Sequence, residues 1–337
     1  MMPSLETRTH ALIAELGLGS AADVHSVIPL TGGVASDIAQ VRMKDSSLCV
    51  KFALPKLKVA EDWRAPVHRN AAEYAWLSVA ARILPEAAVR LYGRSEALHG
   101  FAMEFLEGEA VYLWKTALLD GLAPPRVARD VGDMLGRIHA ASAGDGFDVA
   151  PFQNRDDFFT LRIEPYLTFT ATRHPAVAPQ LTVLAAQLYE ASDVLVHGDV
   201  SPKNILVRSQ GPVILDAECA TMGDAAFDPS FCLNHLALKA AHLPDNRAAL
   251  LRQMTAFWDG YRPYVHWEEP AELEARVCRL LPALLLARVD GKSPAEYIDE
   301  ATRTRVRTTA LALLTSSIRR LPDLIQQIEV KLKGSGR

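Results

Sequence analysis

The sequence has little cysteine, no strong excess of charge of either sign and no long apolar run. Its four cysteines lie far apart without a CxxC pair, which favours buried free thiols in a reducing compartment over disulfides or a zinc site. The net charge of −4 argues against a nucleic-acid-binding protein that relies on a broad basic surface, although not against a local basic cleft. No stretch is long enough to cross a bilayer, and the acidic N-terminal region does not resemble a signal peptide. We therefore expect a cytoplasmic protein with neither nucleic acid nor membrane as a partner.

Internal repeats and low-complexity tracts are also absent from the 337 residues. Hydrophobic residues make up 49% of the chain, enough for a sizeable core, and the length indicates two domains.

The stretch over residues 194–216, VLVHGDVSPKNILVRSQGPVILD, organises the rest of the chain. Strands are expected at Val194–Val196, Ile205–Val207 and Val213–Leu215, with polar turns between them. Asp199, Asn204 and Asp216 then lie at strand ends. An acid, an amide and a second acid suit a hard divalent ion such as Mg²⁺ together with one free general base.

The N-terminal third is rich in strand patterns. They cover residues 27–30, 38–43, 48–54, 88–93 and 101–105. The loop Thr31-Gly32-Gly33-Val34-Ala35-Ser36-Asp37 lies between the first two. Its glycines can leave backbone N–H groups free to approach phosphate oxygens, which makes Gly32, Gly33 and Ser36 candidate nucleotide contacts. A pair of adjacent glycines is by itself more often only a turn.

A lysine in the middle of an apolar strand is more informative. Lys51 lies within Leu48-Cys49-Val50-Lys51-Phe52-Ala53-Leu54, where an ammonium is costly unless it is paired or faces a ligand. A helix expected at about 67–84 carries Glu73, which could reach Lys51 and leave it aimed at a phosphate. Alternatively, Lys51 lies at a sheet edge and Glu73 is solvated.

The segment Met103-Glu104-Phe105-Leu106-Glu107-Gly108-Glu109 is typical of a linker between domains, because a strand gives way to glycine and acids. An extended segment that leaves a sheet edge offers N–H and C=O groups to an adenine edge. Met103, Glu104 and Leu106 are therefore further candidate nucleotide contacts.

The remainder is mostly helical in pattern. His139 ends an apolar stripe at 124–143 and is expected to be a packed histidine with one satisfied nitrogen. Asp228 is expected to cap a helix that starts near Pro229, and it could also brace the polar loop after residue 196. A tight turn at 287–294 either caps the next helix, which we favour, or lines a pocket.

Two groups of residues could be relevant to binding a positively charged ligand. Glu268, Glu269, Glu272 and Glu274 are interpreted as a solvated helix start. The aromatic residues Trp258, Tyr261, Tyr264 and Trp267 could form a cage for a quaternary amine or could simply pack at a helix end.

Together these motifs resemble the aminoglycoside phosphotransferase and choline kinase-like family, relatives of the protein kinases. The matching pieces, in order over about residues 25–235, are TGGVASD, LCVKF, the helix with Glu73, MEFLEGE, HGDVSPKNILV, ILDAE and GDAAFD. The resemblance implies an α+β, bilobal protein kinase-like fold. Residues 1–105 would form a small antiparallel-sheet N-lobe that binds nucleotide, and residues 106–337 a mostly helical C-lobe with the catalytic loop and the acceptor site.

The resemblance also implies ATP-dependent transfer of the γ-phosphoryl group to a hydroxyl of a small molecule. Asp199 would be the catalytic base, and Asn204 and Asp216 would bind Mg²⁺. Lys51 would hold the α- and β-phosphates, with Glu73 fixing Lys51. Such a reaction needs charge neutralisation and alignment more than covalent help.

Several points stay open. The acceptor could be an aminoglycoside-like antibiotic, an amino alcohol or a sugar-like metabolite, and Lys203 and Glu218 have no settled role. The first loop lacks a full GxGxxG, and Ala217-Glu218 follows Asp216 where protein kinases have Phe-Gly, which points away from protein substrates. The alternative is a pseudokinase-like module that binds nucleotide without catalysis.

Overall fold

The structure is a computed structural model, and it describes residues 3–30, 36–56, 66–122 and 124–334. The chain forms two compact units, Met1–Val111 and Tyr112–Arg337. The division of labour proposed for residues 1–105 and 106–337 remains a prediction about function.

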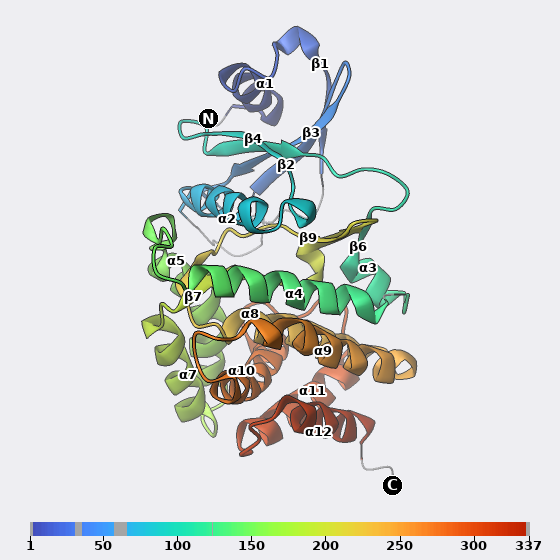
Figure 1. The fold of residues 1–337 in the computed structure, drawn as a ribbon. Helices are drawn as coiled ribbons and strands as arrows, with labels where there is room; N and C mark the ends of the chain where they lie inside the picture. Colours follow the sequence, from blue (N-terminus) through green and yellow to red (C-terminus); the bar gives the residue numbers. More distant parts are fainter. Residues whose placement is uncertain (1–2, 31–35, 57–65, 123, 335–337) are drawn as a thin grey trace. The chain divides into compact units, whose positions relative to one another are not determined.

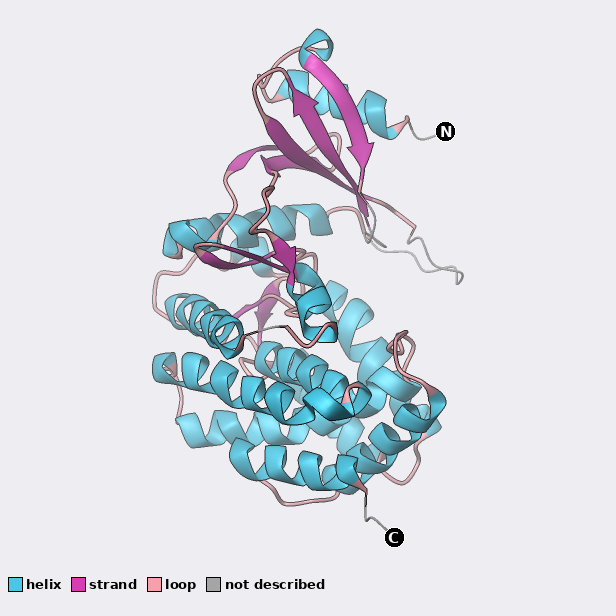
Figure 2. Cartoon of the chain, turned by 90° about the vertical axis from the view of Figure 1, so that its right-hand side faces the viewer, coloured by secondary structure: helices cyan, strands magenta, loops and turns pink. Residues whose placement is uncertain are grey.

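The first unit is built on a five-stranded antiparallel sheet with the strand order β1-β2-β3-β5-β4, drawn in magenta in Figure 2. The strands are β1 (Val24–Pro29), β2 (Ser36–Met43), β3 (Ser47–Ala53), β4 (Leu91–Ser95) and β5 (Gly100–Glu104). The helices are α1 (Leu5–Glu15), η1 (Ala21–Asp23), α2 (Arg69–Ile83) and η2 (Pro85–Ala87).

Every second side chain of these strands points into the core of this unit. Val50 and Phe52 of β3 pack with Ala39 of β2 and with Leu12 and Ile13 of α1. Because successive side chains of a strand point to opposite faces, Lys51 lies on the face away from this core. The central strand β3 therefore presents a lysine on the other side of the sheet.

The strands of the second unit are short, and the three expected over residues 194–216 are confirmed. β7 (Val194–Val196) pairs with β10 (Thr221–Gly223), and β8 (Ile205–Arg208) lies between β6 (Tyr112–Leu113) and β9 (Gly211–Ile214). This strand framework holds residues 197–204 as a connection between β7 and β8.

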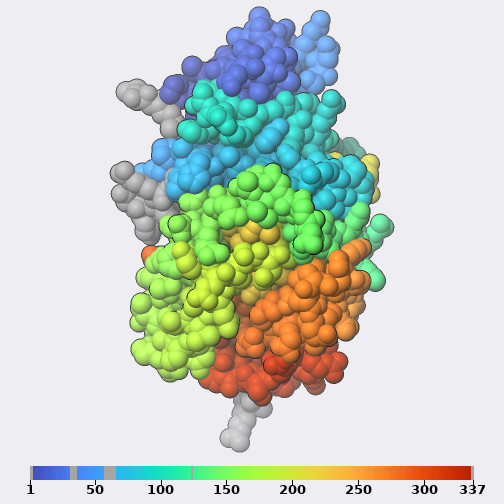
Figure 3. Space-filling view, turned by 60° about the vertical axis from the view of Figure 1, so that its left-hand side comes forward, coloured from blue at the N-terminus to red at the C-terminus, as the bar shows by residue number. Residues whose placement is uncertain are grey.

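Helices make up most of the second unit (Figure 1). They are α3 (Trp114–Leu119), α4 (Pro125–Ser142), η3 (Ala150–Phe152), α5 (Arg155–Phe158), η4 (Phe159–Thr168), α6 (Phe169–Arg173), α7 (Ala178–Glu190), η5 (Pro202–Asn204), α8 (Phe227–His242), η6 (Pro244–Asn246), α9 (Arg247–Tyr261), η7 (Arg262–Tyr264), α10 (Pro270–Asp290), α11 (Glu300–Leu314) and α12 (Leu321–Lys333). In Figure 3 the red helix α12 lies against the orange part of this unit, in agreement with its contacts to α9 and α10.

Helices α4 and α9 run side by side because glycine lets their backbones meet (Figure 1). A Cβ at Gly132 would lie 2.1 Å from the carbonyl oxygen of Phe257, and one at Gly260 would lie 2.1 Å from that of Arg129. Two glycines on facing helices therefore permit a spacing that any larger side chain would prevent. The close approach brings Tyr261 of α9 to His139 of α4.

One helix has an unusual form, and one expectation about a turn needs correction. The segment 159–168, in a part of the chain that is helical in pattern, is a π-helix with Pro165 inside it. The turn expected at 287–294 begins only after Asp290, because α10 continues to that residue. The next helix, α11, is capped by Asp299, whose carboxylate accepts from the N–H of Thr302, so the favoured capping role of the turn was wrong.

The four cysteines are buried and free, as expected. Burial raises the pKa of Cys49, Cys219 and Cys278 to about 12, so these thiols stay protonated at neutral pH. Among the described residues, no helix is both long enough and apolar enough to cross a bilayer.

Candidate active site

Lys51 and Glu73 form a buried ion pair in the first unit. The Nζ atom of Lys51 lies 2.8 Å from each carboxylate oxygen of Glu73, and the side chains are 2% and 1% exposed. Lys51 belongs to the middle strand of the sheet, between β2 and β5, so the alternative of a lysine at a sheet edge is wrong. The carboxylate fixes the ammonium at a position where an unpaired charge would be costly.

Of the other candidate nucleotide contacts, Ser36, Met103 and Glu104 lie on strands of the same sheet. Ser36 is the buried first residue of β2, and Met103 is buried on β5 beside Cys49 of β3. Glu104 ends β5 and accepts from the N–H of Arg90, while Leu106 lies in the non-strand segment that follows. Gly32 and Gly33 lie outside the described residues.

In the second unit the loop predicted to be catalytic, His197–Asn204, connects β7 to β8, and it is called the catalytic loop below. Gly198 adopts a φ of +81°, and a Cβ there would lie 2.8 Å from the Cβ of Cys219. The neighbouring His197 is held on both sides, because its Nδ1 accepts from the N–H of Asp199 and its Nε2 lies 3.2 Å from the carbonyl oxygen of Leu215. Burial lowers the pKa of His197, so the neutral ring acts as a structural link within the loop.

Asp228 braces this loop from α8. Its carboxylate accepts from the N–H of His197 at 2.6 Å and from the N–H of Gly198 at 2.9 Å. The expectation that Asp228 caps a helix is wrong, because α8 begins at Phe227 with Ala226 at its cap position, and the carboxylate is engaged by the loop amides.

His139 supports the brace with both ring nitrogens, and not with one as expected. Its Nε2 lies 3.3 Å from Asp228 Oδ2 and its Nδ1 lies 2.9 Å from Tyr261 Oη. All three side chains are fully buried. The catalytic loop is therefore tied to α4, α8 and α9 through hydrogen bonds that solvent does not reach.

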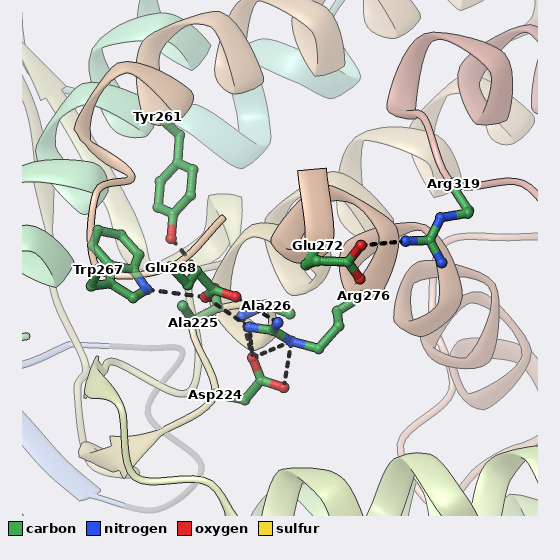
Figure 4. A network of polar contacts seen from close by, with 9 residues as sticks. All are labelled: Asp224, Ala225, Ala226, Tyr261, Trp267, Glu268, Glu272, Arg276 and Arg319. Atoms are coloured by element: carbon green, nitrogen blue, oxygen red, sulfur yellow. Dashed lines mark hydrogen bonds and ion pairs between the residues drawn. The ribbon is translucent and has the colours of Figure 1, made fainter. Parts of the chain in front are cut away.

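An arginine network strengthens the start of α8 (Figure 4). Asp224 accepts from the N–H of Ala226, and Arg276 of α10 donates to both Asp224 and Glu268. Trp267 also donates to Glu268 through Nε1 at 3.0 Å. The interpretation of Glu268 as a solvated acid was therefore wrong, because Arg276 and Trp267 hold it in a half-buried position.

The other aromatic residues near this network pack and do not form a cage. Tyr261 is fully buried and stacks with Trp258 and Phe257, and Tyr264 donates to Asp133. This group belongs to the helix packing behind the catalytic loop.

Asp199 is 5% exposed and is flanked by two cations. Arg162 Nη2 lies 3.0 Å and Lys203 Nζ 3.2 Å from the same oxygen, Oδ2. Burial raises the pKa of Asp199, but Lys203 and Arg162 together outweigh it and lower the pKa below its ordinary value. Within the described chain Oδ1 has no partner, so one oxygen is fixed by cations and the other is available to a ligand.

Arg162 is the residue that the sequence did not reveal. It lies in the π-helix η4 and also donates to the carbonyl oxygens of Gly198 and Leu161. Its only sequence signal is a charge within an apolar stretch that contains a proline, and π-helical turns are frequent at functional sites.

Asn204 and Asp216 present oxygen atoms near the loop. Asn204 donates through Nδ2 to the carbonyl oxygen of Asp199 at 3.0 Å, and its own backbone accepts from Leu215. No described residue donates to Asn204 Oδ1, so its carbonyl is available. Asp216 has a φ of +70°, a conformation that a non-glycine residue rarely adopts, and its carboxylate lies within 4.8 Å of that of Glu218. An amide oxygen and two carboxylates are the donors that a hard divalent cation prefers, so the residues present fit such an ion.

The first unit's antiparallel sheet and the second unit's mostly helical body define a protein kinase-like fold of the kind found in small-molecule phosphotransferases. Over residues 26–273 the chain matches the model of the phosphotransferase enzyme family, and it belongs to that family.

Individual relatives are distant. A methylthioribose kinase from Bacillus cereus is 24% identical over 233 residues, and the match spans 61% of this chain and 59% of the relative's length. A choline/ethanolamine kinase family protein from Mesorhizobium loti has a similar structure, with a TM-score of 0.54, 17% identity and coverage of 96% and 98% of the two chains. An amicoumacin kinase in complex with AMP-PNP and Ca²⁺ gives a TM-score of 0.51 at 14% identity, covering 97% of this chain and 96% of the other.

Proposed function

We propose that this protein transfers the γ-phosphoryl group of ATP to a hydroxyl of a small molecule. The observation that carries the proposal is the state of Asp199, whose Oδ2 is fixed by Arg162 and Lys203 while Oδ1 has no partner among the described residues. An anionic carboxylate that is positioned in this way can accept the hydrogen bond of an acceptor hydroxyl and align its oxygen with the phosphorus atom.

The low pKa of Asp199 fits this reaction. A loose phosphoryl-transfer transition state needs little deprotonation of the nucleophile before attack, so a weak base suffices if it holds the hydroxyl in line. The proton passes to Asp199 as the new P–O bond forms and ADP leaves.

Nucleotide binding is proposed for the first unit. Lys51, held by Glu73, would contact the α- and β-phosphates, and Gly32, Gly33 and Ser36 would offer backbone N–H groups to the phosphates. The segment after β5 would bind the adenine edge, with apolar contact from Met103. In the described chain the N–H of Leu106 donates to no protein oxygen, which leaves it available for such a contact.

Asn204 and Asp216 would hold a divalent cation, and Mg²⁺ is the ion we propose; Glu218 lies close enough to Asp216 to contribute. Such an ion would neutralise phosphate charge when bound. The amicoumacin kinase structure with AMP-PNP and Ca²⁺ supports a nucleotide and a divalent cation in this fold.

The test is transfer of ³²P from γ-labelled ATP to a panel of aminoglycosides, amino alcohols, sugars and sugar acids in the presence of Mg²⁺. We expect labelled product with at least one acceptor, no product with Asp199→Asn, and nucleotide binding retained in that variant. Nucleotide binding without transfer to any acceptor would contradict the proposal and favour the pseudokinase-like module.

Lys51→Met supplies a second arm of the test. It should lower ATP affinity with little loss of acceptor binding, because it removes a phosphate contact and leaves the second unit unchanged. Lys44→Met is the matched control, since Lys44 lies in the turn between β2 and β3 outside the proposed site.

A further inference from the structure

Three cationic side chains of the second unit gather beyond the catalytic loop, and they are named here the cationic cluster: Lys115, Lys239 and Arg288. They come from α3, α8 and the last turns of α10. Lys239 is 1% exposed and Arg288 is 8% exposed, so two of the three charges are buried. Buried charges of like sign are costly to a fold unless something of opposite sign compensates them.

The compensation within the described chain is incomplete. Lys115 pairs with Glu296, a side chain that is 66% exposed. Arg288 donates to Ser293 and lies 3.5 Å from Tyr166 Oη, which are neutral groups. Lys239 has no carboxylate within ion-pair distance among the described residues and instead lies over the ring of Tyr297, 5.2 Å from its centroid. Three cations therefore share one carboxylate, and it is largely in solvent.

The electrostatics of Lys239 agree with this geometry. Burial first, and then Lys115 and Arg288, lower the pKa of Lys239 to about 7, and Glu296 offsets only part of this effect. Lys239 is therefore only partly protonated at neutral pH, and a bound anion would raise its pKa and favour the charged form.

Hydrogen-bond donors of the same region also lack acceptors. The Oη atom of Tyr297 and the Nε atom of Arg288 are buried and have no partner among the described residues. Buried donors are nearly always satisfied in folded proteins. Together with the ammonium of Lys239, which lies over the ring of Tyr297, these atoms are three donors of one region that have no protein acceptor among the described residues.

The cluster continues toward the catalytic loop through α8. Phe231, His235 and Lys239 are four residues apart and share one face of this helix. His235 lies against Phe231, and its pKa is lowered well below the ordinary value by burial and then by Arg288, Lys239 and Lys203. Lys203 is the residue that contacts Asp199, so one face of α8 leads from the cationic cluster to the catalytic aspartate.

We propose that the cationic cluster, with Tyr297, binds an oxyanion carried by the phosphate acceptor. This inference rests on the proposed function and names the class of its substrate: a hydroxylated small molecule that bears a carboxylate or a phosphate. In the reaction an acceptor hydroxyl oxygen forms a bond to the γ-phosphorus of ATP, the bond to the β,γ-bridging oxygen breaks, ADP leaves with that electron pair, and the hydroxyl proton passes to Asp199. A polycationic aminoglycoside would meet like charges at this site and be rejected.

The experiment compares four probes built on one carbon skeleton: D-gluconate, D-glucose 6-phosphate, D-glucitol and D-glucosamine. Binding is measured by isothermal calorimetry and transfer by release of ADP in the presence of Mg²⁺-ATP. We expect gluconate or glucose 6-phosphate to bind at least tenfold more tightly than glucitol and glucosamine, and the better of the two anions identifies the oxyanion.

The variants are Lys239→Met and Lys115→Met, with Arg319→Met as the control. Lys239→Met removes a buried, uncompensated charge and should fold with an unchanged or higher Tm; Lys115→Met alters a partly exposed side chain that the fold tolerates. Each should weaken anion binding at least tenfold and leave the KM for ATP unchanged. Arg319, which pairs with exposed Glu272 on another part of the unit, should have no effect.

Preferred use of glucitol or glucosamine, with no effect of Lys239→Met, would overturn the anion site and leave the kinase intact. Anion binding that depends on Lys239 without transfer to any probe or to the wider panel would overturn the kinase and retain the anion site. Equal binding of all four probes by wild type and variants would also overturn the anion site.

Discussion

The brace between Asp228 and the catalytic loop should contribute a large part of the protein's stability. The carboxylate accepts from the N–H groups of His197 and Gly198 at 2.6 and 2.9 Å, and all of these atoms are buried. A hydrogen bond to a charged group contributes about 1.5–3 kcal/mol, and a buried donor left without a partner costs a similar amount. Asp228→Ala should therefore lower the free energy of unfolding by about 3–6 kcal/mol, which is much of the total for a typical domain.

The assay is urea unfolding followed by far-ultraviolet circular dichroism and tryptophan fluorescence. Asp228→Asn keeps one carbonyl oxygen for one of the two amides, so its loss should be about half that of Asp228→Ala. Asp259→Ala is the matched control, because Asp259 is an exposed helical acid, and its effect should stay within about 0.5 kcal/mol.

A loss below about 1 kcal/mol for Asp228→Ala, similar to that of Asp259→Ala, would refute the reasoning, since it would mean that the loop amides find other acceptors or water at little cost. If Asp228→Ala does not fold, the half-size effect of Asp228→Asn still decides the question.

Three further predictions concern single substitutions. Gly198→Ala should reduce transfer at least tenfold and destabilise the fold, because neither the φ of +81° nor the surroundings of Gly198 admit a Cβ. Gly146 is the control, since it has a φ of +88° but open space around it. Gly146→Ala should only lower the free energy of unfolding, by about 1 kcal/mol. Arg162→Met should raise the pKa of Asp199 and move the acid limb of the kcat/KM profile to higher pH; an unmoved limb would show that Arg162 does not act on Asp199. Lys239 has a folded-state pKa of about 7, so between about pH 7 and pH 10 the unfolded chain binds more protons than the folded chain. The free energy of unfolding of wild type, relative to that of Lys239→Met, should therefore rise by up to about 1.4 kcal/mol per pH unit in this range. A difference that does not change with pH would contradict the burial of Lys239.

The strand framework around Asp199 and the strand position of Lys51 could be predicted because both depend on local patterns. Apolar runs bounded by glycine, proline and asparagine indicate strands and turns directly. A lysine inside such a run is conspicuous because of the cost of burying its charge. The sequence left the pairing of Lys51 with Glu73 open, and the structure decides it.

Arg162 and Lys239 could not be predicted because their roles depend on contacts between distant segments. Arg162 reaches Asp199 from 37 residues earlier in the chain through a π-helix, which has no recognised sequence pattern of its own. Lys239 lies on a helix where a lysine near the end is commonly a solvated residue, and the packing of α10 and α11 against α8 buries it.

Asp228 shows a second reason why local sequence patterns do not determine the role of a residue. An acid just before a proline is a reasonable helix cap by local rules, and the sequence also left open that it braces the loop. The backbone amides of His197 and Gly198, directly after β7, both donate to this carboxylate, and the tertiary contacts prevail. Local propensity is a weak guide wherever a buried donor needs an acceptor.

The central claim is that Asp199 directs a phosphoryl transfer to a small-molecule hydroxyl. The most direct measurement is the formation of ³²P-labelled acceptor from γ-labelled ATP and Mg²⁺ by wild type and by Asp199→Asn, with calorimetric nucleotide binding measured on both proteins. We expect labelled product with wild type, a loss of at least a hundredfold with Asp199→Asn and similar nucleotide affinity for the two proteins. Labelled product formed equally well by Asp199→Asn would contradict this claim.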